Sequence, residues 1–283
     1  LENIMEKAHT AGKMTGVVTT VPVSHSTPAG FVVHTSNRYD YADIMRQYLF
    51  ASVLNVAMGA GHPWYDANGH RSEEADYRYV GGGNLWEELV SGVAGNDITG
   101  DGNVNYWTFI EDREAFQRLK NGDTPNRVFG VAKVHATLQA GRDGESMEPY
   151  DIPFIETVPT LEEMTLAAIN VLDEGPNGFV LMIEGGAVDW MCHNNDMPRM
   201  IEEQASFNHT VQVVVDWVVN NSSWGETLVI VTGDHETGYL LGPDSGMMLD
   251  KDGHEAPVWT DIQNKGQGRL PMAAWYSTDH TNS

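Results

Sequence analysis

The sequence is short of cysteine, of basic residues and of long apolar runs. Cys192 is its only cysteine, so an internal disulfide is excluded. Lysine and arginine number 16 against 40 aspartate and glutamate residues, which gives a formal net charge of -24 at pH 7. Such an acidic surface repels phosphate backbones and anionic lipids. Nucleic acid and membranes are therefore not expected as partners, and no apolar run is long enough to span a bilayer.

The rest of the composition fits one globular domain. A chain of 283 residues with 41% apolar content can bury a full core. Scarce lysine and abundant aspartate resemble halophilic proteins of marine or salty habitats, and an ordinary acidic bacterial protein has the same balance. The sequence starts inside an amphipathic helical pattern, with neither an initiator Met nor a signal peptide. We therefore expect residues 1–283 to be a single incomplete domain that is cut at both ends.

Apolar runs with strand character alternate with helical patterns along the chain. The expected strands are residues 15–23, 53–58, 127–132, 179–183 and 227–231, and the clearest helices are 43–51, 164–172 and 198–219. This alternation predicts an α/β fold with a doubly wound, mostly parallel sheet and helices on both faces. Residues 62–117 are rich in Gly, Asp, Asn and aromatics, and we interpret them as an irregular insertion within the same domain.

Two short runs place carboxylate and imidazole side chains directly after apolar strands. The run Glu-Gly-Gly-Ala-Val-Asp-Trp-Met-Cys-His occupies residues 184–193, after the expected strand 179–183. The run Thr-Gly-Asp-His occupies residues 232–235, after the expected strand 227–231. Parallel strands that end in this way present such side chains at one edge of a rigid sheet. One pair alone is typical of solvated loop groups, but two clusters together predict divalent metal sites.

The spacing of these side chains suggests separate ions. Asp189 and His193 lie four residues apart, share one face of a helical turn and can hold one Zn²⁺. Glu184 suits a harder ion such as Mg²⁺, which prefers oxygen ligands. The adjacent Asp234 and His235 can serve a second Zn²⁺. A distant histidine, His280, could close the first zinc site.

Taken in order, the motifs resemble those of the alkaline phosphatases over nearly the whole chain. The carrying segments are Gly-Lys at 12–13, His-Ser-Thr-Pro-Ala at 25–29, His-Thr-Ser-Asn-Arg at 34–38, Glu-Gly-Gly-Ala-Val-Asp at 184–189 with His193, Val-Thr-Gly-Asp-His-Glu at 231–236 and Asp-His at 279–280. The insertion is most similar to the marine bacterial branch. The resemblance implies hydrolysis of small phosphate monoesters through a phosphoserine, by a homodimer in the periplasm or secreted, with two Zn²⁺ and one Mg²⁺ per intact active site.

The resemblance also implies a role for each matching residue. The expected metal ligands are Asp189, His193 and His280 for the first zinc, Asp234 and His235 for the second, and Glu184, Thr27 and His25 for Mg²⁺, with His25 acting directly or through water. Arg38 is the expected catalytic phosphate clamp, since its planar, permanently charged guanidinium suits two phosphate oxygens. Trp190 stands at a substrate-binding position where other members carry Lys or His, so phosphate affinity and pH optimum are expected to differ.

The departures from the family pattern limit what this chain is expected to do. The Asp-Ser-Ala run that carries the family's nucleophile does not occur in the sequence, nor does the family's bridging Asp upstream of it. Covalent catalysis needs its nucleophile, so the chain alone is expected to be inactive. Two other interpretations stay open: a phosphodiesterase or sulfatase of the same superfamily, and a catalytically inactive metal-binding fragment. Arg38 with the site of Glu184 and Thr27 favours monoesters.

A weaker signal lies within the insertion. The run Asp-Ile-Thr-Gly-Asp-Gly-Asn-Val-Asn at 97–105 is similar to a calcium loop, with Gly102 at the sharp turn. Its twelfth position is Thr108 in place of a bidentate Glu. A calcium site and a plain Asx-rich turn are both compatible with this pattern.

Overall fold

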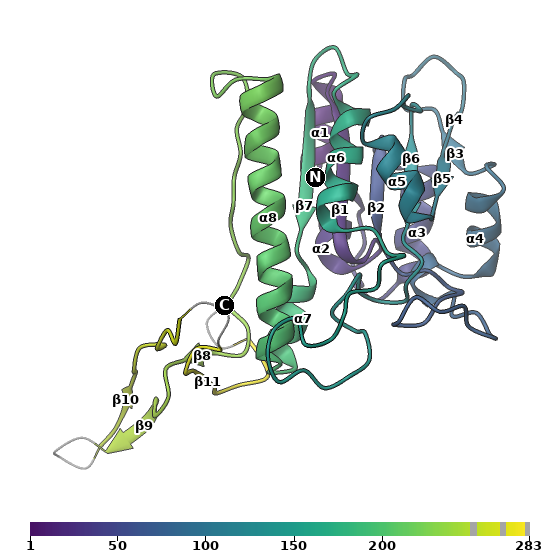
Figure 1. The fold of residues 1–283 in the computed structure, drawn as a ribbon. Helices are drawn as coiled ribbons and strands as arrows, with labels where there is room; N and C mark the ends of the chain where they lie inside the picture. Colours follow the sequence, from purple (N-terminus) through teal and green to yellow (C-terminus); the bar gives the residue numbers. More distant parts are fainter. Residues whose placement is uncertain (250–253, 267–269, 281–283) are drawn as a thin grey trace.

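Five parallel strands form the central sheet of the computed structural model, which describes residues 1–249, 254–266 and 270–280. They are β1 (Met14–Pro22), β2 (Val56–Ala60), β5 (Thr108–Ile110), β6 (Val128–Val131) and β7 (Phe179–Glu184). Their order is β5-β6-β2-β1-β7, and every ladder between neighbours is parallel (Figure 1). The inner strands β1, β2 and β6 are almost wholly buried, because both faces of the sheet are covered.

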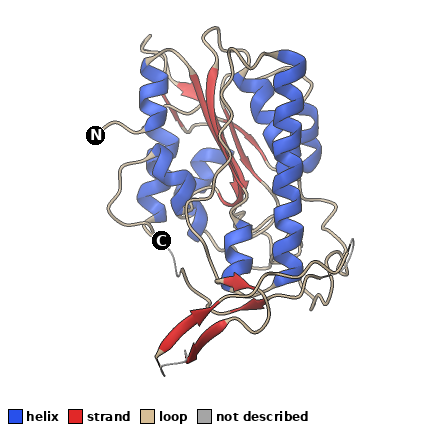
Figure 2. Cartoon of the chain, turned by 90° about the vertical axis from the view of Figure 1, so that its left-hand side faces the viewer, coloured by secondary structure: helices blue, strands red, loops and turns tan. Residues whose placement is uncertain are grey.

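Helices cover both faces of this sheet, as the alternation of patterns predicted. One core packs against α1 (Ile4–Thr10), α2 (Ser26–Val32), α3 (Tyr41–Phe50) and α4 (Gly83–Val90). The other packs against α5 (Arg113–Leu119) and α6 (Leu161–Leu172), with α8 (Met197–Asn221) beside α6. Figure 2 shows the sheet between these two groups of helices. The doubly wound α/β class is thereby confirmed.

The helix starts follow from local hydrogen bonding. Thr160 caps α6: its hydroxyl accepts from the Glu163 N–H at 3.1 Å, and the Glu163 carboxylate accepts from the Thr160 N–H at 3.0 Å. Asp196 caps α8 by accepting from the Arg199 N–H at 3.1 Å, and Pro198 lies in the first turn. Among the described residues, no helix combines the length and apolarity needed to cross a bilayer.

A short helix, α7 (Ala187–His193), follows the carboxyl end of β7 at once. The Thr20 hydroxyl, at the carboxyl end of β1, accepts from the Ala187 N–H at 3.0 Å and so ties the helix start to the sheet. The turn between strand and helix needs glycine, since a Cβ on Gly185 would lie 3.0 Å from the Phe207 ring and one on Gly186 would lie 2.9 Å from Val21. The expected helical turn that holds Asp189 is therefore present at this edge.

The predicted insertion at 62–117 is more regular than its composition suggested. It contains the turn η1 (Arg78–Val80), α4, the hairpin of β3 (Gly95–Asn96) and β4 (Asn105–Tyr106), and most of α5. It also supplies β5, which pairs in parallel with β6 and closes one side of the central sheet. Part of the stretch thus belongs to the sheet itself.

The predicted strand at 227–231 is wrong. The segment forms no ladder with any described strand, and Leu228, Ile230 and Val231 are 83%, 74% and 57% exposed. An apolar run becomes a strand when a neighbouring strand satisfies its backbone groups. The described sheet ends at β7, which pairs only with β1, so this segment has no ladder to join.

Beyond this segment the chain forms two short antiparallel pairs. They join β8 (Leu240–Leu241) to β11 (Ala274–Trp275) and β9 (Gly246–Leu249) to β10 (Glu255–Val258). The Gly238 N–H donates to the Asp279 carbonyl at 3.1 Å, which holds the end of the chain against the loop that follows 227–231. The pair β9 and β10 projects away from the sheet, below α7 (Figure 1).

Candidate metal centre

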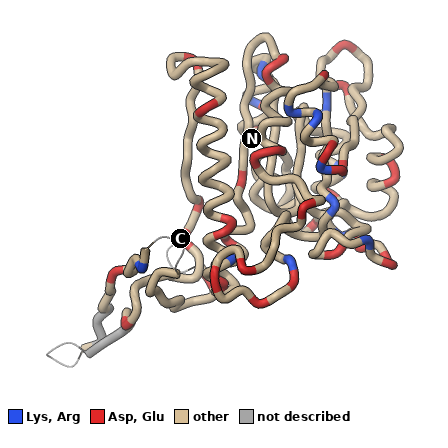
Figure 3. The backbone as a smooth tube through the Cα atoms, in the orientation of Figure 1, with Lys and Arg blue, Asp and Glu red and all other residues tan. Residues whose placement is uncertain are grey.

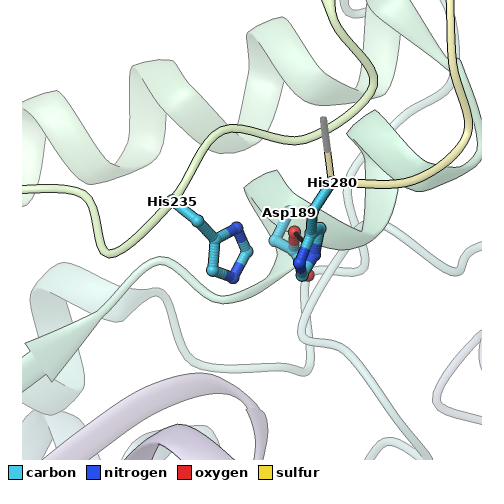
Figure 4. Close-up of side chains that lie close together, drawn as sticks. All are labelled: Asp189, His235 and His280. Atoms are coloured by element: carbon cyan, nitrogen blue, oxygen red, sulfur yellow. Dashed lines mark ion pairs between the residues drawn. The ribbon is translucent and has the colours of Figure 1, made fainter. Parts of the chain in front are cut away.

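Side chains from three distant segments meet beyond the carboxyl end of β7. Asp189 and His193 lie on α7, His235 lies on the loop that follows 227–231, and His280 lies near the chain end. One ligand atom each from Asp189, His235 and His280 lies within 4.8 Å of the others. Figure 4 shows the carboxylate and the two rings close together between the helices and the loops. Figure 3 shows acidic residues spread over the whole fold, this end included.

The imidazoles of His193 and His280 both reach the Asp189 carboxylate. Nε2 of His193 lies 3.6 Å from Oδ2 of Asp189, and Nε2 of His280 lies 3.7 Å from Oδ1. The two Nε2 atoms are 3.2 Å apart. Two imidazole nitrogens on one tetrahedral Zn²⁺ at the usual bond length are about 3.3 Å apart. The three side chains that the sequence predicted as one site thus converge with a spacing that suits this ion.

Hydrogen bonding fixes the ring of His193. Its Nδ1 lies 2.6 Å from the carbonyl oxygen of Thr278, and a carbonyl only accepts, so Nδ1 carries the proton. In the neutral ring, Nε2 then directs its lone pair toward Asp189 and His280. A lone pair that faces a carboxylate is unfavourable unless a cation lies between them, and an imidazole oriented from its far side by a carbonyl is the usual arrangement of a metal ligand. The donor set therefore fits Zn²⁺.

His235 lies against the first group of ligands. Its ring stacks on that of His280 with centroids 3.8 Å apart, and its Nε2 lies 3.4 Å from Oδ2 of the exposed Asp234. The two predicted zinc sets are therefore contiguous. Asp234 follows an exposed extended segment where the sequence predicted a buried strand.

Glu184 occupies the end of β7, close to the same group. It accepts a hydrogen bond of 2.5 Å from the Thr19 hydroxyl and another from the Thr27 hydroxyl. Burial raises the pKa of Glu184, the two threonine hydrogen bonds oppose this, and the charges of Asp234 and Asp189 raise it further. Three carboxylates thus face one region, and a cation there relieves their repulsion. The structure brings Glu184 and Thr27 together, as predicted.

His25, Trp190 and Arg38 lie on the α2 side of this group. The His25 and Trp190 rings meet edge to face with centroids 5.3 Å apart. Burial, with the positive charge of Arg38 added, lowers the pKa of His25 to about 4, against the opposing effect of Asp189. The imidazole is therefore neutral at physiological pH. Nη2 of the exposed Arg38 donates to the Ser26 hydroxyl at 2.5 Å, which places the guanidinium at the start of α2.

Sequence reasoning missed two threonines in the site. Thr19 donates to Glu184, and Thr237 donates to Asp189 at 2.5 Å. The signal for Thr19 was its place near the carboxyl end of an apolar strand, next to Thr20. The signal for Thr237 was its position two residues after His235, on the same loop.

The acidic loop at 97–105 forms an Asx-rich turn. The Asp97 carboxylate accepts from the N–H groups of Thr99, Gly100 and Gly102 at 3.1, 2.7 and 2.8 Å. Asp101 accepts from the Asn103 N–H at 2.8 Å. These oxygens serve the backbone of their own turn, and a calcium role for the loop stays a prediction.

A parallel sheet with imidazoles and carboxylates gathered beyond its carboxyl edge defines an α/β protein with a candidate divalent metal centre. The chain belongs to the alkaline phosphatase family, whose model matches residues 1–281.

Named relatives agree with this membership. The repressible alkaline phosphatase of Saccharomyces cerevisiae is 28% identical over 249 residues, which cover 84% of this chain and 40% of that protein. A cold-active alkaline phosphatase from a psychrophilic Shewanella sp. has a TM-score of 0.65 at 22% identity, covering 100% of this chain and 71% of the other. A variant of the alkaline phosphatase of the Antarctic bacterium TAB5 has a TM-score of 0.59 at 22% identity, covering 100% and 66%. These two structures share the fold. The chain spans under half the length of the yeast relative.

Proposed function

We propose that the whole protein hydrolyses small phosphate monoesters with two Zn²⁺ and one Mg²⁺ in its active site. The observation that carries the proposal is the convergence of Asp189, His235 and His280, with the Nε2 atoms of His193 and His280 close to each other and to the Asp189 carboxylate. Family membership supplies the reaction class. In the TAB5 variant, Mg is bound in the M3 site of that protein, which supports a magnesium requirement.

The residues divide between the proposed ions as their donor atoms suggest. Asp189, His193 and His280 would hold the first zinc, Asp234 and His235 the second, and Glu184, Thr27 and His25 the magnesium. When bound, these ions supply Lewis-acid stabilisation of the departing and attacking oxygens. His25 suits its place, because a neutral imidazole beside Mg²⁺ avoids repulsion between two cations.

Substrate binding is proposed for Arg38 and Trp190. The guanidinium of Arg38 is exposed near the start of α2, and its planar fork can bind two non-bridging phosphate oxygens. Trp190 packs against His25 and presents an aromatic surface beside the ligands. A side chain in this place would change the affinity for phosphate. Neither side chain transfers a proton.

The covalent step needs a nucleophile that is not among these residues. The family route forms a phosphoserine, in which a serine oxygen binds phosphorus as the alcohol leaves and water later releases phosphate. The 283 residues contain no Asp-Ser-Ala run. Turnover is therefore proposed for the whole protein, and metal binding for the chain described above.

Assembly and location are proposed from family membership. We infer a homodimer that is periplasmic or secreted, because these properties accompany the family resemblance. The formal charge of -24 supports a preference for saline conditions, since screening reduces self-repulsion. Sedimentation at low and high salt tests the dimer and the salt effect together.

The test of the reaction class is a comparison of substrates on the whole protein. With Zn²⁺ and Mg²⁺ present, an aryl phosphate should be hydrolysed much faster than the matching diester or sulfate ester. Arg38→Ala should slow monoester hydrolysis by about 100- to 1000-fold, the range for removing one preorganised electrostatic contact. Arg46→Ala, on the exposed face of α3, is the matched control. Equal or faster turnover of the diester or the sulfate would contradict the proposal.

A further inference from the structure

Thr237 contacts two of the proposed metal ligands at once. Its hydroxyl lies 2.5 Å from Oδ1 of Asp189 and 3.2 Å from Nδ1 of His235. The side chain is half-buried and comes from the same loop as His235. A single small hydroxyl therefore links a carboxylate on α7 to an imidazole on a separate segment.

The direction of these two hydrogen bonds follows from the groups involved. An ionised carboxylate only accepts hydrogen bonds, so the Thr237 hydroxyl donates its single proton to Asp189. Toward His235 the same oxygen can then only accept. Nδ1 of His235 also lies 3.2 Å from the carbonyl oxygen of Glu236, which is another pure acceptor. In the neutral ring the two acceptors at 3.2 Å place the proton on Nδ1, and Nε2, which lies 3.4 Å from Oδ2 of Asp234, keeps its lone pair for an ion.

We infer that Thr237 is a positioning residue that holds the Asp189 carboxylate and the His235 tautomer ready for metal binding. It resembles in role the Thr278 carbonyl, which orients His193 in the same way from the far side of the ring. The inference rests on the proposed metal-dependent function. It adds that the affinity of both zinc sets depends on one hydroxyl that is not itself a proposed ligand.

Backbone hydrogen bonds join the loop that carries His235 to the segment 276–279, but they do not act on the side chains of the ligands. Asp234 is exposed and the segment before it joins no described sheet ladder, so the loop that carries His235 is held on its β8 side only. The Thr237 hydrogen bond to Asp189 joins this loop to α7 at the position where the ligands meet. Outer-sphere hydrogen bonds of this kind typically change metal affinity by about 10- to 100-fold when they are removed.

The experiment compares three substitutions at two threonines of one loop. Thr237→Val removes the hydroxyl at nearly constant volume, Thr237→Ser keeps it, and Thr232→Val is the matched control. The Thr232 hydroxyl donates to the Gly233 carbonyl at 3.0 Å and is exposed. Competition with a chromophoric chelator gives the Zn²⁺ affinity of each protein. Thr237→Val should bind Zn²⁺ about 10- to 100-fold more weakly, whereas the other two variants should stay within about threefold of the parent.

A second measurement begins with the unsubstituted protein, so its first result holds even where Thr237→Val fails to fold. Histidine ¹⁵N resonances of the metal-free parent should show His235 protonated at Nδ1 at pH 8. In Thr237→Ser the same resonance should persist. The visible spectrum of Co²⁺-loaded protein should change in Thr237→Val and match the parent in Thr232→Val.

The outcomes separate this inference from the proposed function. A parent protein that binds no Zn²⁺ in the chelator competition overturns both. A parent that binds Zn²⁺ while Thr237→Val binds it equally well overturns the role of Thr237 alone. Protonation of His235 at Nε2, or failure of Thr237→Ser to retain affinity, also overturns that role.

Discussion

Two clusters of acidic side chains lie close to α7 and α8, and they differ in what balances their charge. In the first, the buried ion network, the Glu202 carboxylate accepts from Arg142 at 2.6 Å and from Arg199 at 3.5 Å, and the charges of both arginines also act on the buried Glu203. At the candidate metal centre, carboxylates face imidazoles, and the guanidinium of Arg38 bonds to Ser26 instead. Carboxylates with their own guanidinium partners stabilise the fold, whereas carboxylates opposed by imidazole lone pairs are suited to bind cations.

The largest expected effect comes from breaking the buried ion network. Arg142→Leu removes the 2.6 Å partner of Glu202 and leaves a carboxylate that is 2% exposed without it. It also removes hydrogen bonds to the carbonyls of Pro153, Gln139 and Ile152. Removing one partner of a buried ion pair costs about 3–5 kcal/mol, and the 3.5 Å contact between Glu202 and Arg199 remains in the variant. Urea unfolding of metal-free protein should show this loss, and Arg46→Leu on the surface should show almost none.

Glu203 gives this network its pH dependence. Burial raises its pKa from 4.5 to about 7 in the folded protein, against the opposing charges of Arg142 and Arg199. The folded state therefore holds an extra proton between about pH 4.5 and 7, and the stability this gives is complete below that range and lost as pH rises through it.

Glu203→Gln removes this titration. Between pH 4.5 and 8.5 the parent should lose about 3 kcal/mol of stability relative to the variant, from the two pKa values. Urea unfolding at several pH values, in the presence of chelator, measures the difference. Glu174→Gln, at an exposed position, should follow the parent at every pH. A difference that does not depend on pH would contradict the raised pKa.

Asp189→Asn tests the candidate metal centre, the second of the two clusters. An oxygen of Asp189 lies within 3.7 Å of the Nε2 atom of His193, and another within 3.7 Å of that of His280. Because loss of an outer-sphere partner alone costs about 10- to 100-fold in affinity, loss of this ligand should weaken Zn²⁺ binding by more than about 100-fold. Isothermal titration calorimetry measures the change, and Asp216→Asn, exposed on α8, is the control. Unchanged affinity for Zn²⁺ would show that Asp189 is not a ligand of this ion.

The smallest expected effect is a gain in stability, whereas Arg142→Leu is expected to cost stability and Asp189→Asn to cost metal affinity. It concerns Glu184→Gln. The pKa of Glu184 is raised, so its ionised form is disfavoured in the metal-free fold, and this penalty is felt above its unfolded pKa. At pH 8 with chelator, Glu184→Gln should raise the melting temperature by about 1–4 °C, equivalent to roughly 1 kcal/mol or less. Added Mg²⁺ should then stabilise the parent more than the variant. A lower melting temperature in the variant would contradict this prediction. It would show that the Glu184 carboxylate stabilises the metal-free fold, as the Glu202 carboxylate does.

The sequence predicted the parallel sheet and the helices on both faces, because continuous apolar runs and 3.6-residue periodicity are local properties of the chain. It also paired Asp189 with His193, since four residues on a helix fix their spacing. It failed at 227–231, where apolar character alone indicated a strand. Whether such a run is buried depends on a neighbouring strand, which no local pattern can supply.

The amino-acid sequence by itself determined which side chains can bind a cation and at which segment ends they lie. Only the tertiary structure decided that His280 meets His193 with 3.2 Å between their Nε2 atoms, and that His235 stacks on His280. It also decided that Thr237 joins Asp189 to His235. These contacts join residues up to 87 positions apart, from His193 to His280. Their geometry comes from the sheet, the caps and the backbone bonds that hold the loops, and not from any spacing along the chain.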